Sequence, residues 1–252
     1  MQQDGAGAPP DARSPLSVDI AEKTFRSAEG VLVTALKDLS FEVRPGEFAC
    51  LLGPSGCGKT TTLRILLGLD KDFAGSFRLP EDGTGRVAAV FQEPTLLPWR
   101  TVEQNDRLAL PEALRDTDLS PLFQSLGLAG MRTLFPSELS LGLARRAALA
   151  RAFAIEPAVL FLDEPFVSLD EQTAERLRYL LLSVWSGRPT TALMVTHNLR
   201  EALMLSDRII VLSARPAGVV GMFDVALPRQ QRSPEAIDDL LSLFHRRFAE
   251  GT

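Results

Sequence analysis

The stretch LGPSGCGKTTTLRIL, residues 52–66, decides how the whole chain is interpreted. An apolar run ends at Leu52, a segment with three glycines and a proline follows, and apolar residues then recur at helical spacing. The segment GPSGCGKT, Gly53–Thr60, matches the pattern G-x-x-x-x-G-K-[ST] of a phosphate-binding loop. That pattern needs a strand before it and a helix after it, and both flanks fit. A glycine-rich turn that only caps a core helix is the weaker alternative.

The residue types in this loop suit a nucleoside triphosphate. Gly56 and Gly58 let successive backbone N–H groups turn toward one anion without a side-chain clash. A helix that starts near Lys59 adds the partial positive charge of its N-terminus. Lys59 is expected to reach the β- and γ-phosphates, the Thr60 hydroxyl to bind Mg²⁺, and Thr61 to place a hydroxyl near the α-phosphate. The other predicted phosphate-loop residues are Gly53, Pro54, Ser55 and Cys57, the last with its side chain as a bystander.

The composition limits the classes of protein that remain. The chain has 252 residues, 45% of them apolar, which is enough for a large domain with a buried core. Lys and Arg number 27 against 32 Asp and Glu, and the formal net charge of −5 argues against a nucleic-acid binder. The two cysteines, Cys50 and Cys57, are too few for a disulfide framework. Residues 1–15 have the composition of a disordered tail, and no apolar run reaches the roughly 18 residues that indicate a membrane span.

Strand and helix patterns alternate along the rest of the chain. Residues 16–25 and 32–46 predict edge strands, and residues 47–52 predict a buried strand before the glycine loop. Further strands are expected at 86–92, 158–163, 190–197, 207–214 and 219–227. Helices are expected at 60–69, 140–155, 172–185, 199–205 and 234–250, with a broken helical pattern over 101–135. The expected fold is therefore α/β, a P-loop NTPase core with a mostly parallel sheet, an antiparallel β edge subdomain and a helical lobe.

The sequence AVLFLDEP, residues 158–165, places two acidic residues at the end of a buried strand. At this edge of an open α/β sheet, ligands bind. Asp163 is expected to hold the metal, directly or through water, and Glu164 to take a proton from an attacking water. A turn that merely ends the strand before Pro165 is the alternative. Together with the glycine loop, the pair predicts hydrolysis of a nucleoside triphosphate.

Four further stretches narrow the class: VFQEPTLLPW with Gln92, ELSLGLARRAALARA, SLD at Ser168–Asp170, and VTHN with His197. In this order the motifs resemble those of the ATP-binding cassette ATPases, the motor subunits of ABC transporters. The resemblance extends from Leu16 to Arg229 and is strongest to the nitrate, sulfonate and taurine import branch. It implies an ABC ATPase domain over residues 16–230, with the helical lobe at about 101–155, and a C-terminal helix within 231–252.

The resemblance also assigns roles to single residues. Phe25 corresponds to the aromatic residue that stacks on adenine, although a core phenylalanine is an alternative. Gln92 corresponds to the residue that contacts Mg²⁺ or the attacking water, and His197 to the one that contacts the γ-phosphate. Asp170 is expected at the interface between two subunits, and it could also cap the helix that follows it.

The signature segment departs from the family's pattern L-S-G-G-Q, because it reads LSLGL at residues 139–143. In the family this segment comes from one subunit and covers the ATP of the other. Ser140 and Gly142 are kept, whereas Leu141 replaces a glycine and Leu143 replaces the glutamine. Two accounts stay open. The chain is either a homodimeric ATPase whose site still closes or a weakened subunit that pairs with a different ATPase. The first is favoured because the site residues that the chain itself supplies (the in-cis residues) are intact.

The partners follow from the same resemblance. We expect integral-membrane permease subunits that dock near Gln92 and the helical lobe, with Thr95–Arg100 as the candidate docking surface, although Trp99 and the leucines could equally be lobe core. A periplasmic solute-binding protein is expected in the same system. The chain is then a peripheral protein at the cytoplasmic face of the inner membrane. A P-loop kinase or a GTPase would leave His197 and the signature segment unexplained, and a regulatory module that binds nucleotide without hydrolysis remains a third class.

Overall fold

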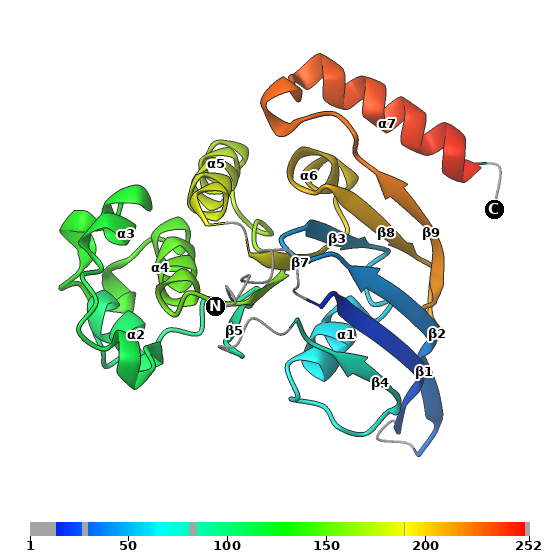
Figure 1. Cartoon of the computed structure of the whole chain (residues 1–252), viewed down its shortest axis with the longest axis horizontal. Helices are drawn as coiled ribbons and strands as arrows, with labels where there is room; N and C mark the ends of the chain where they lie inside the picture. The colour runs from blue at the N-terminus through cyan, green and yellow to red at the C-terminus, as the bar shows by residue number, and fades with distance from the viewer. Residues whose placement is uncertain (1–13, 27–29, 81–84, 189, 250–252) are drawn as a thin grey trace, which may run out of the picture.

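The computed structural model of the chain describes residues 14–26, 30–80, 85–188 and 190–249. Residues 1–13 of the expected disordered tail lie outside this range, as do residues 250–252 at the other end. Within it, two sheets and the helices around them form the α/β architecture expected from the sequence (Figure 1).

The larger sheet has six strands in the order β5-β6-β7-β3-β8-β9. All neighbouring strands pair in parallel except β8 and β9, which are antiparallel at one edge. The strands are β3 (Phe48–Leu52), β5 (Val87–Val90), β6 (Val159–Asp163), β7 (Thr191–Thr196), β8 (Arg208–Leu212) and β9 (Val219–Asp224). The central strands β3, β6 and β7 are buried along their whole length, which explains their continuous apolar runs.

The smaller sheet is antiparallel, with the order β2-β1-β4. Its strands are β1 (Leu16–Arg26), β2 (Leu32–Val43) and β4 (Ala74–Arg78). The sequence predicted β1 and β2 but missed β4. Four of the five residues of β4 are exposed, so its sequence AGSFR carries no alternation of apolar and polar residues.

Helices lie on both faces of the larger sheet and at its ends. They are α1 (Lys59–Leu66), α2 (Val102–Ala109), α3 (Ser120–Ser125), α4 (Leu141–Ala154), α5 (Glu171–Gly187), α6 (Leu199–Leu205) and α7 (Pro234–Ala249). Figure 1 shows α2, α3 and α4 grouped at one side of the molecule and α7 near β9 at the other. Helix α1 ends earlier than the predicted residue 69, because Gly68 has φ of 69° and its N–H bonds the Ile65 carbonyl.

Alternate residues of β3 enter two different cores, as the period of two of a strand requires. Phe48, Cys50 and Leu52 belong to the core that also contains residues of α4 and α5. Ala49 and Leu51 belong to the core that lies between this sheet, α1 and the smaller sheet. Because β3 is held from both faces, the loop that follows it starts from a rigid position.

Candidate functional site

Strand register brings the predicted site residues to one edge of the larger sheet. Leu52 of β3 lies opposite Thr196 of β7, and Asp163 of β6 lies opposite Val195 of β7. The segments that follow these strands therefore leave the sheet side by side at its carboxyl edge, where ligands bind in open α/β sheets. A cavity of about 490 Å³ opens there. Its lining residues are Ser55, Gly56, Gly58, Lys59, Thr60, Thr61, Gln92, Glu164, Val167, His197 and Arg215.

The glycine loop needs glycine where the backbone turns. Gly56 and Gly58 have φ of 76° and 128°, in the region that favours glycine. A Cβ atom on Gly58 would lie 2.5 Å from Leu36 Cδ2 of β2, so no other residue fits there without a shift. The loop thus passes directly from β3 into the N-terminus of α1, as an anion-binding loop requires.

Lys59 is buried in the centre of this loop. Its Nζ donates to the carbonyl oxygens of Gly53 and Pro54 at 2.8 and 2.9 Å. The same Nζ lies 3.7 Å from Glu164 Oε1. The ammonium is therefore held between the glycine loop and the acidic pair, where it can serve a phosphate from one side and a carboxylate from the other.

Asp163 and Thr60 form the part of the site that fits a divalent cation. The Thr60 hydroxyl donates to Asp163 Oδ1 at 3.1 Å, and the Asp163 side chain is buried. Burial raises the pKa of Asp163, and the hydrogen bond from Thr60 opposes that rise. Mg²⁺ prefers such hard oxygen ligands, and it completes its shell with water and phosphate oxygens. Among the described residues no cluster of three or more His, Cys, Asp or Glu could hold a metal ion.

Glu164 points away from Asp163 because the backbone turns sharply between them. Its φ is 44°, which is uncommon for a residue with a side chain, and its N–H bonds the Val195 carbonyl at 3.0 Å. Glu164 Oε2 then lies 2.7 Å from His197 Nδ1. The carboxylate is oriented by His197 on one oxygen and faced by Lys59 on the other, as a general base needs.

Gln92 lines the cavity, and its backbone is held by a residue that the sequence analysis did not single out. Arg145 of α4 is buried and donates to the Pro165 carbonyl at 2.9 Å and to the Gln92 carbonyl at 3.3 Å. Burial lowers the pKa of Arg145. This arginine joins the signature helix to the end of β5 and to the turn after the acidic pair. In the sequence it is one of two adjacent arginines, and nothing local separates it from a surface charge.

Ser140, Gly142 and Asp170 do not line the cavity of the single chain. Ser140 Oγ accepts from the Leu143 N–H at 3.3 Å and caps α4, while Asp170 Oδ1 accepts from the Thr173 N–H at 3.0 Å and caps α5. The capping role foreseen for Asp170 is therefore present. Whether these residues also reach a second subunit stays a prediction.

The structure also places the two replaced leucines of the signature and Phe25. Leu141 is 42% exposed, whereas Leu143 packs against the main core. Phe25 is also 42% exposed, with Lys23 Nζ 4.6 Å from its ring centroid, so it is not a core phenylalanine. Its stacking on adenine stays a prediction, because the ring does not line the cavity at the glycine loop.

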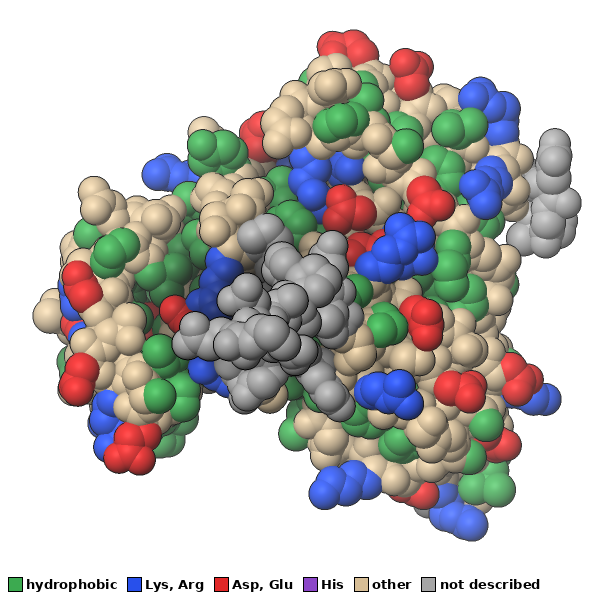
Figure 2. All heavy atoms as spheres, viewed as in Figure 1, with side chains coloured by type: hydrophobic (Ala, Val, Ile, Leu, Met, Phe, Trp, Pro, Cys, Tyr) green, Lys and Arg blue, Asp and Glu red, His purple; other side chains and the backbone are tan. Residues whose placement is uncertain are grey.

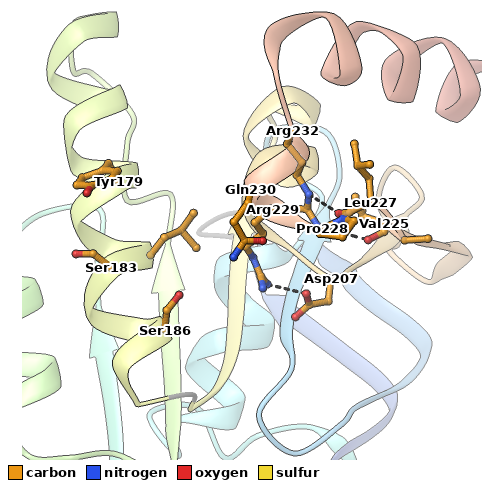
Figure 3. Close-up of a pocket in the computed structure, with 12 residues that line it drawn as sticks. Tyr179, Ser183, Ser186, Asp207, Val225, Leu227, Pro228, Arg229, Gln230 and Arg232 are labelled. Atoms are coloured by element: carbon orange, nitrogen blue, oxygen red, sulfur yellow. Dashed lines mark hydrogen bonds and ion pairs between the residues drawn. The ribbon is translucent and has the colours of Figure 1, made fainter.

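A second cavity, of about 610 Å³, lies away from these residues between α5 and the segment that follows β9 (Figure 3). Its two arginines are engaged with the protein itself. Arg229 pairs with Asp207 at 2.8 Å and stacks over Trp185, and Arg232 donates to backbone carbonyls at the end of α6. Its described lining residues include no lysine and no part of the glycine loop.

The fold and the site together define a P-loop ATPase of the ATP-binding cassette class. Residues 36–167 match the family described as ABC transporter. The chain belongs to the ABC transporter family.

Two groups of curated relatives agree with the import branch that the motifs predicted. The chain is 43% identical over 231 residues to an aliphatic sulfonates import ATP-binding protein, SsuB 2, of Burkholderia cenocepacia, which spans 86% of this chain and 85% of the relative. It is 39% identical to the nitrate import ATP-binding protein NrtC of Synechococcus elongatus, over 88% of this chain and 36% of that protein.

Solved structures give the same class. The dimeric structure of MJ0796, a bacterial ABC transporter cassette, matches with a TM-score of 0.70 and 26% identity, over 85% of this chain and all of that one. A post-hydrolysis state of MJ0796 bound to ADP and Pi matches with a TM-score of 0.68. The chain is an ABC-type ATPase. None of the helices described is long and apolar enough to cross a membrane.

Proposed function

We propose that this chain binds Mg·ATP at the glycine loop and hydrolyses it to drive an importer built with membrane permease subunits. The observation that carries the proposal is a cavity at the carboxyl edge of the sheet that Lys59, Thr60 and the Glu164–His197 pair line together. The buried Asp163 lies directly behind it, hydrogen-bonded to Thr60. A fold-level resemblance alone would not assign a reaction, whereas this set supplies each part that phosphoryl transfer to water needs.

The residues divide the chemistry between them. The backbone amides of the loop and Lys59 hold the β- and γ-phosphates. Thr60 with Asp163 would hold Mg²⁺, which would supply charge neutralisation at the phosphates. Glu164, fixed by His197, accepts the proton of the attacking water on its carboxylate. His197 donates a hydrogen bond to the γ-phosphate in this proposal, and Gln92 contacts the metal or the water. Phe25 supplies an exposed ring for the adenine.

A second subunit completes this site. Ser140 and Gly142 stay outside the cavity of their own chain, and the related cassette MJ0796 forms a dimer. We infer a homodimer in which LSLGL of one subunit covers the ATP of the other. The intact in-cis residues favour this arrangement over a weakened subunit paired with a different ATPase.

The docking surface for the permease is the segment Thr95–Arg100. Trp99 is 69% exposed, so it is not lobe core, whereas Leu96 packs inward. Asn105 fixes the segment by accepting from the Leu97 N–H at 2.7 Å and donating to the Leu97 carbonyl at 3.2 Å. A rigid backbone that displays an aromatic side chain is suited to a partner groove.

The importer's solute is proposed from the relatives' names. An aliphatic sulfonate comes first because a relative with that name is 43% identical, against 39% for the nitrate relative. A periplasmic solute-binding protein belongs to such a system, and the chain then works at the cytoplasmic face of the inner membrane.

Figure 2 shows acidic and basic side chains interspersed on the face that it presents.

The test is phosphate release by the purified chain and by Glu164→Gln. The amide keeps the shape but cannot accept the proton, so we expect at least a ~100-fold loss of turnover with ATP affinity retained. Glu175→Gln, an exposed change on α5, serves as the control and should behave as the wild type. If the wild type bound ATP and released no phosphate, the chain would be a regulatory module instead.

A further inference from the structure

Arg215 reaches the glycine loop from a distant part of the chain. It lies in the connection between β8 and β9 and lines the same cavity as Lys59 and Glu164. One of its terminal nitrogens donates to the Gly56 carbonyl at 2.6 Å, a contact between residues 159 positions apart. None of the roles assigned above uses this side chain.

The backbone around Arg215 is held in place, so the contact does not depend on a loose loop. The Ser213 hydroxyl bonds the Pro216 carbonyl at 3.2 Å and accepts from the Gly218 N–H at 3.0 Å. The Ala217 N–H bonds the Ala35 carbonyl of β2 at 2.9 Å, and the Ala217 carbonyl accepts from Lys37. The connection is thus fastened to β2, which also packs against Gly58 of the glycine loop.

The contact fixes the direction of a peptide group in the loop. In a trans peptide the carbonyl and the next N–H point in opposite directions. While Arg215 holds the Gly56 carbonyl, the Cys57 N–H points to the other side, where it meets the Pro54 carbonyl at 3.3 Å. Lys59 Nζ also bonds that carbonyl, so the Cys57 N–H faces the inside of the loop. Glycine at position 56 leaves this peptide free to turn if nothing holds it.

Arg215 also changes the charge of the cavity. The cations that line it are Lys59 and Arg215, and Lys59 already lies 3.7 Å from Glu164. Among the residues that the structure describes, no carboxylate lies within ion-pair distance of Arg215. A guanidinium has five N–H donors in a planar fork, and the contact with Gly56 leaves others to face an anion.

We propose that Arg215 is a positioning residue of the nucleotide site, which holds the Gly56 carbonyl and with it the turn of the glycine loop, and which adds positive charge for a nucleoside polyphosphate. The proposal rests on the proposed function. It places the effect of Arg215 on nucleotide affinity, and not on the hydrolytic step, because the side chain contacts neither Glu164 nor His197.

The experiment compares Arg215→Ala, Arg215→Gln and Arg215→Lys in the full chain. The readouts are the Kd for ADP by calorimetry at low and high salt, kcat and KM for ATP, and Tm without nucleotide. We expect Arg215→Ala to raise the Kd and KM about tenfold with kcat within about twofold of the wild type. Arg215→Lys keeps charge and a donor and should recover most of the affinity, with Arg215→Gln between the two. The salt dependence of the Kd should be weaker in Arg215→Ala.

Arg78→Ala, an exposed arginine on β4, is the matched control and should leave every readout unchanged. Kd and KM of Arg215→Ala equal to those of the wild type would overturn the proposal. So would a joint loss of kcat and Tm that Arg215→Lys fails to recover, because that pattern marks a residue that only maintains the fold. A wild type that bound no nucleotide would instead overturn the proposed function.

Discussion

At the scale of the residue, the adjacent carboxylates Asp163 and Glu164 have different contacts because the backbone points their side chains in different directions. Asp163 ends β6 in extended conformation and meets Thr60, whereas Glu164 turns at φ of 44° and meets His197. This difference matches the proposed roles of Asp163 as a metal ligand and Glu164 as a general base. The separation of the two roles depends on that turn, which the letters DEP alone do not reveal.

Asp106 lies in an environment that disfavours the ionised form of its carboxyl group. Its side chain is fully buried in α2, and neither carboxylate oxygen has a hydrogen-bond partner among the described residues. Burial raises the pKa of Asp106 to about 8, while Arg151 of α4 opposes that rise and Glu103 of α2 adds to it. The folded chain therefore keeps a proton that the unfolded chain loses above about pH 4.

Asp106→Asn should remove this pH dependence. Between about pH 4 and 8 the folded state of the wild type holds one more proton, so its stability falls with rising pH by up to ~1.4 kcal/mol per unit. We expect the Tm of the wild type to fall from pH 5 to pH 8, and that of Asp106→Asn to fall less and to be higher at pH 8. Asp116→Asn, on an exposed residue, is the control. Equal slopes for Asp106→Asn and the wild type would contradict the prediction.

At the scale of the element, the N-termini of α4 and α5 meet. Both are capped, by Ser140 and Asp170, and a Cβ atom on Gly142 of α4 would lie 2.7 Å from Thr173 Cγ2 of α5. The glycine kept in the divergent signature thus allows a close approach between two helices. The signature segment and the Asp170 segment are joined through this contact.

Gly142→Ala should destabilise the chain although alanine favours helix formation. Overpacking against Thr173 is expected to cost about 1–3 kcal/mol, and the gain in helix propensity offsets only about 1 kcal/mol of it. We expect a lower Tm for Gly142→Ala and its recovery in Gly142→Ala with Thr173→Ser, which removes the opposing methyl group. Thermal unfolding of the wild type and the two variants measures this. If Gly142→Ala alone were more stable than the wild type, the prediction would be wrong, because the two helices would then separate easily to make room for the methyl group.

The elements themselves were largely predictable, and the contacts between them were not. Parallel strands buried on both faces leave continuous apolar runs, so β3, β6 and β7 stood out, and the glycine loop and acidic pair followed from their places at strand ends. Arg145 and Arg215 act through backbone carbonyls far away in sequence, and no local pattern marks such a contact. Asp106 lies within a helical segment that carries other polar residues, so its burial left no signal either.

At the scale of the whole molecule, the cavity of one chain contains the in-cis machinery but not the signature residues. Leu141 is exposed at the start of α4, whereas Leu143 is partly buried and packs against the core. The two substitutions in the signature are therefore not equivalent. We expect the first to affect assembly with a second copy and the second to affect the stability of this chain.

The closed dimer can be tested with the hydrolysis-deficient Glu164→Gln chain on a sizing column. We expect a monomer without nucleotide and a dimer with ATP, because hydrolysis no longer reopens the interface.

Leu141→Gly in the otherwise wild-type chain should then raise turnover several-fold, since it removes bulk from the segment that covers the partner's ATP. Leu143→Gln should instead lower Tm without that gain, because it buries a polar amide. Elution of Glu164→Gln as a monomer at saturating ATP would contradict the dimer, whereas unchanged turnover in Leu141→Gly would show that the divergent signature closes the site as well as glycine does.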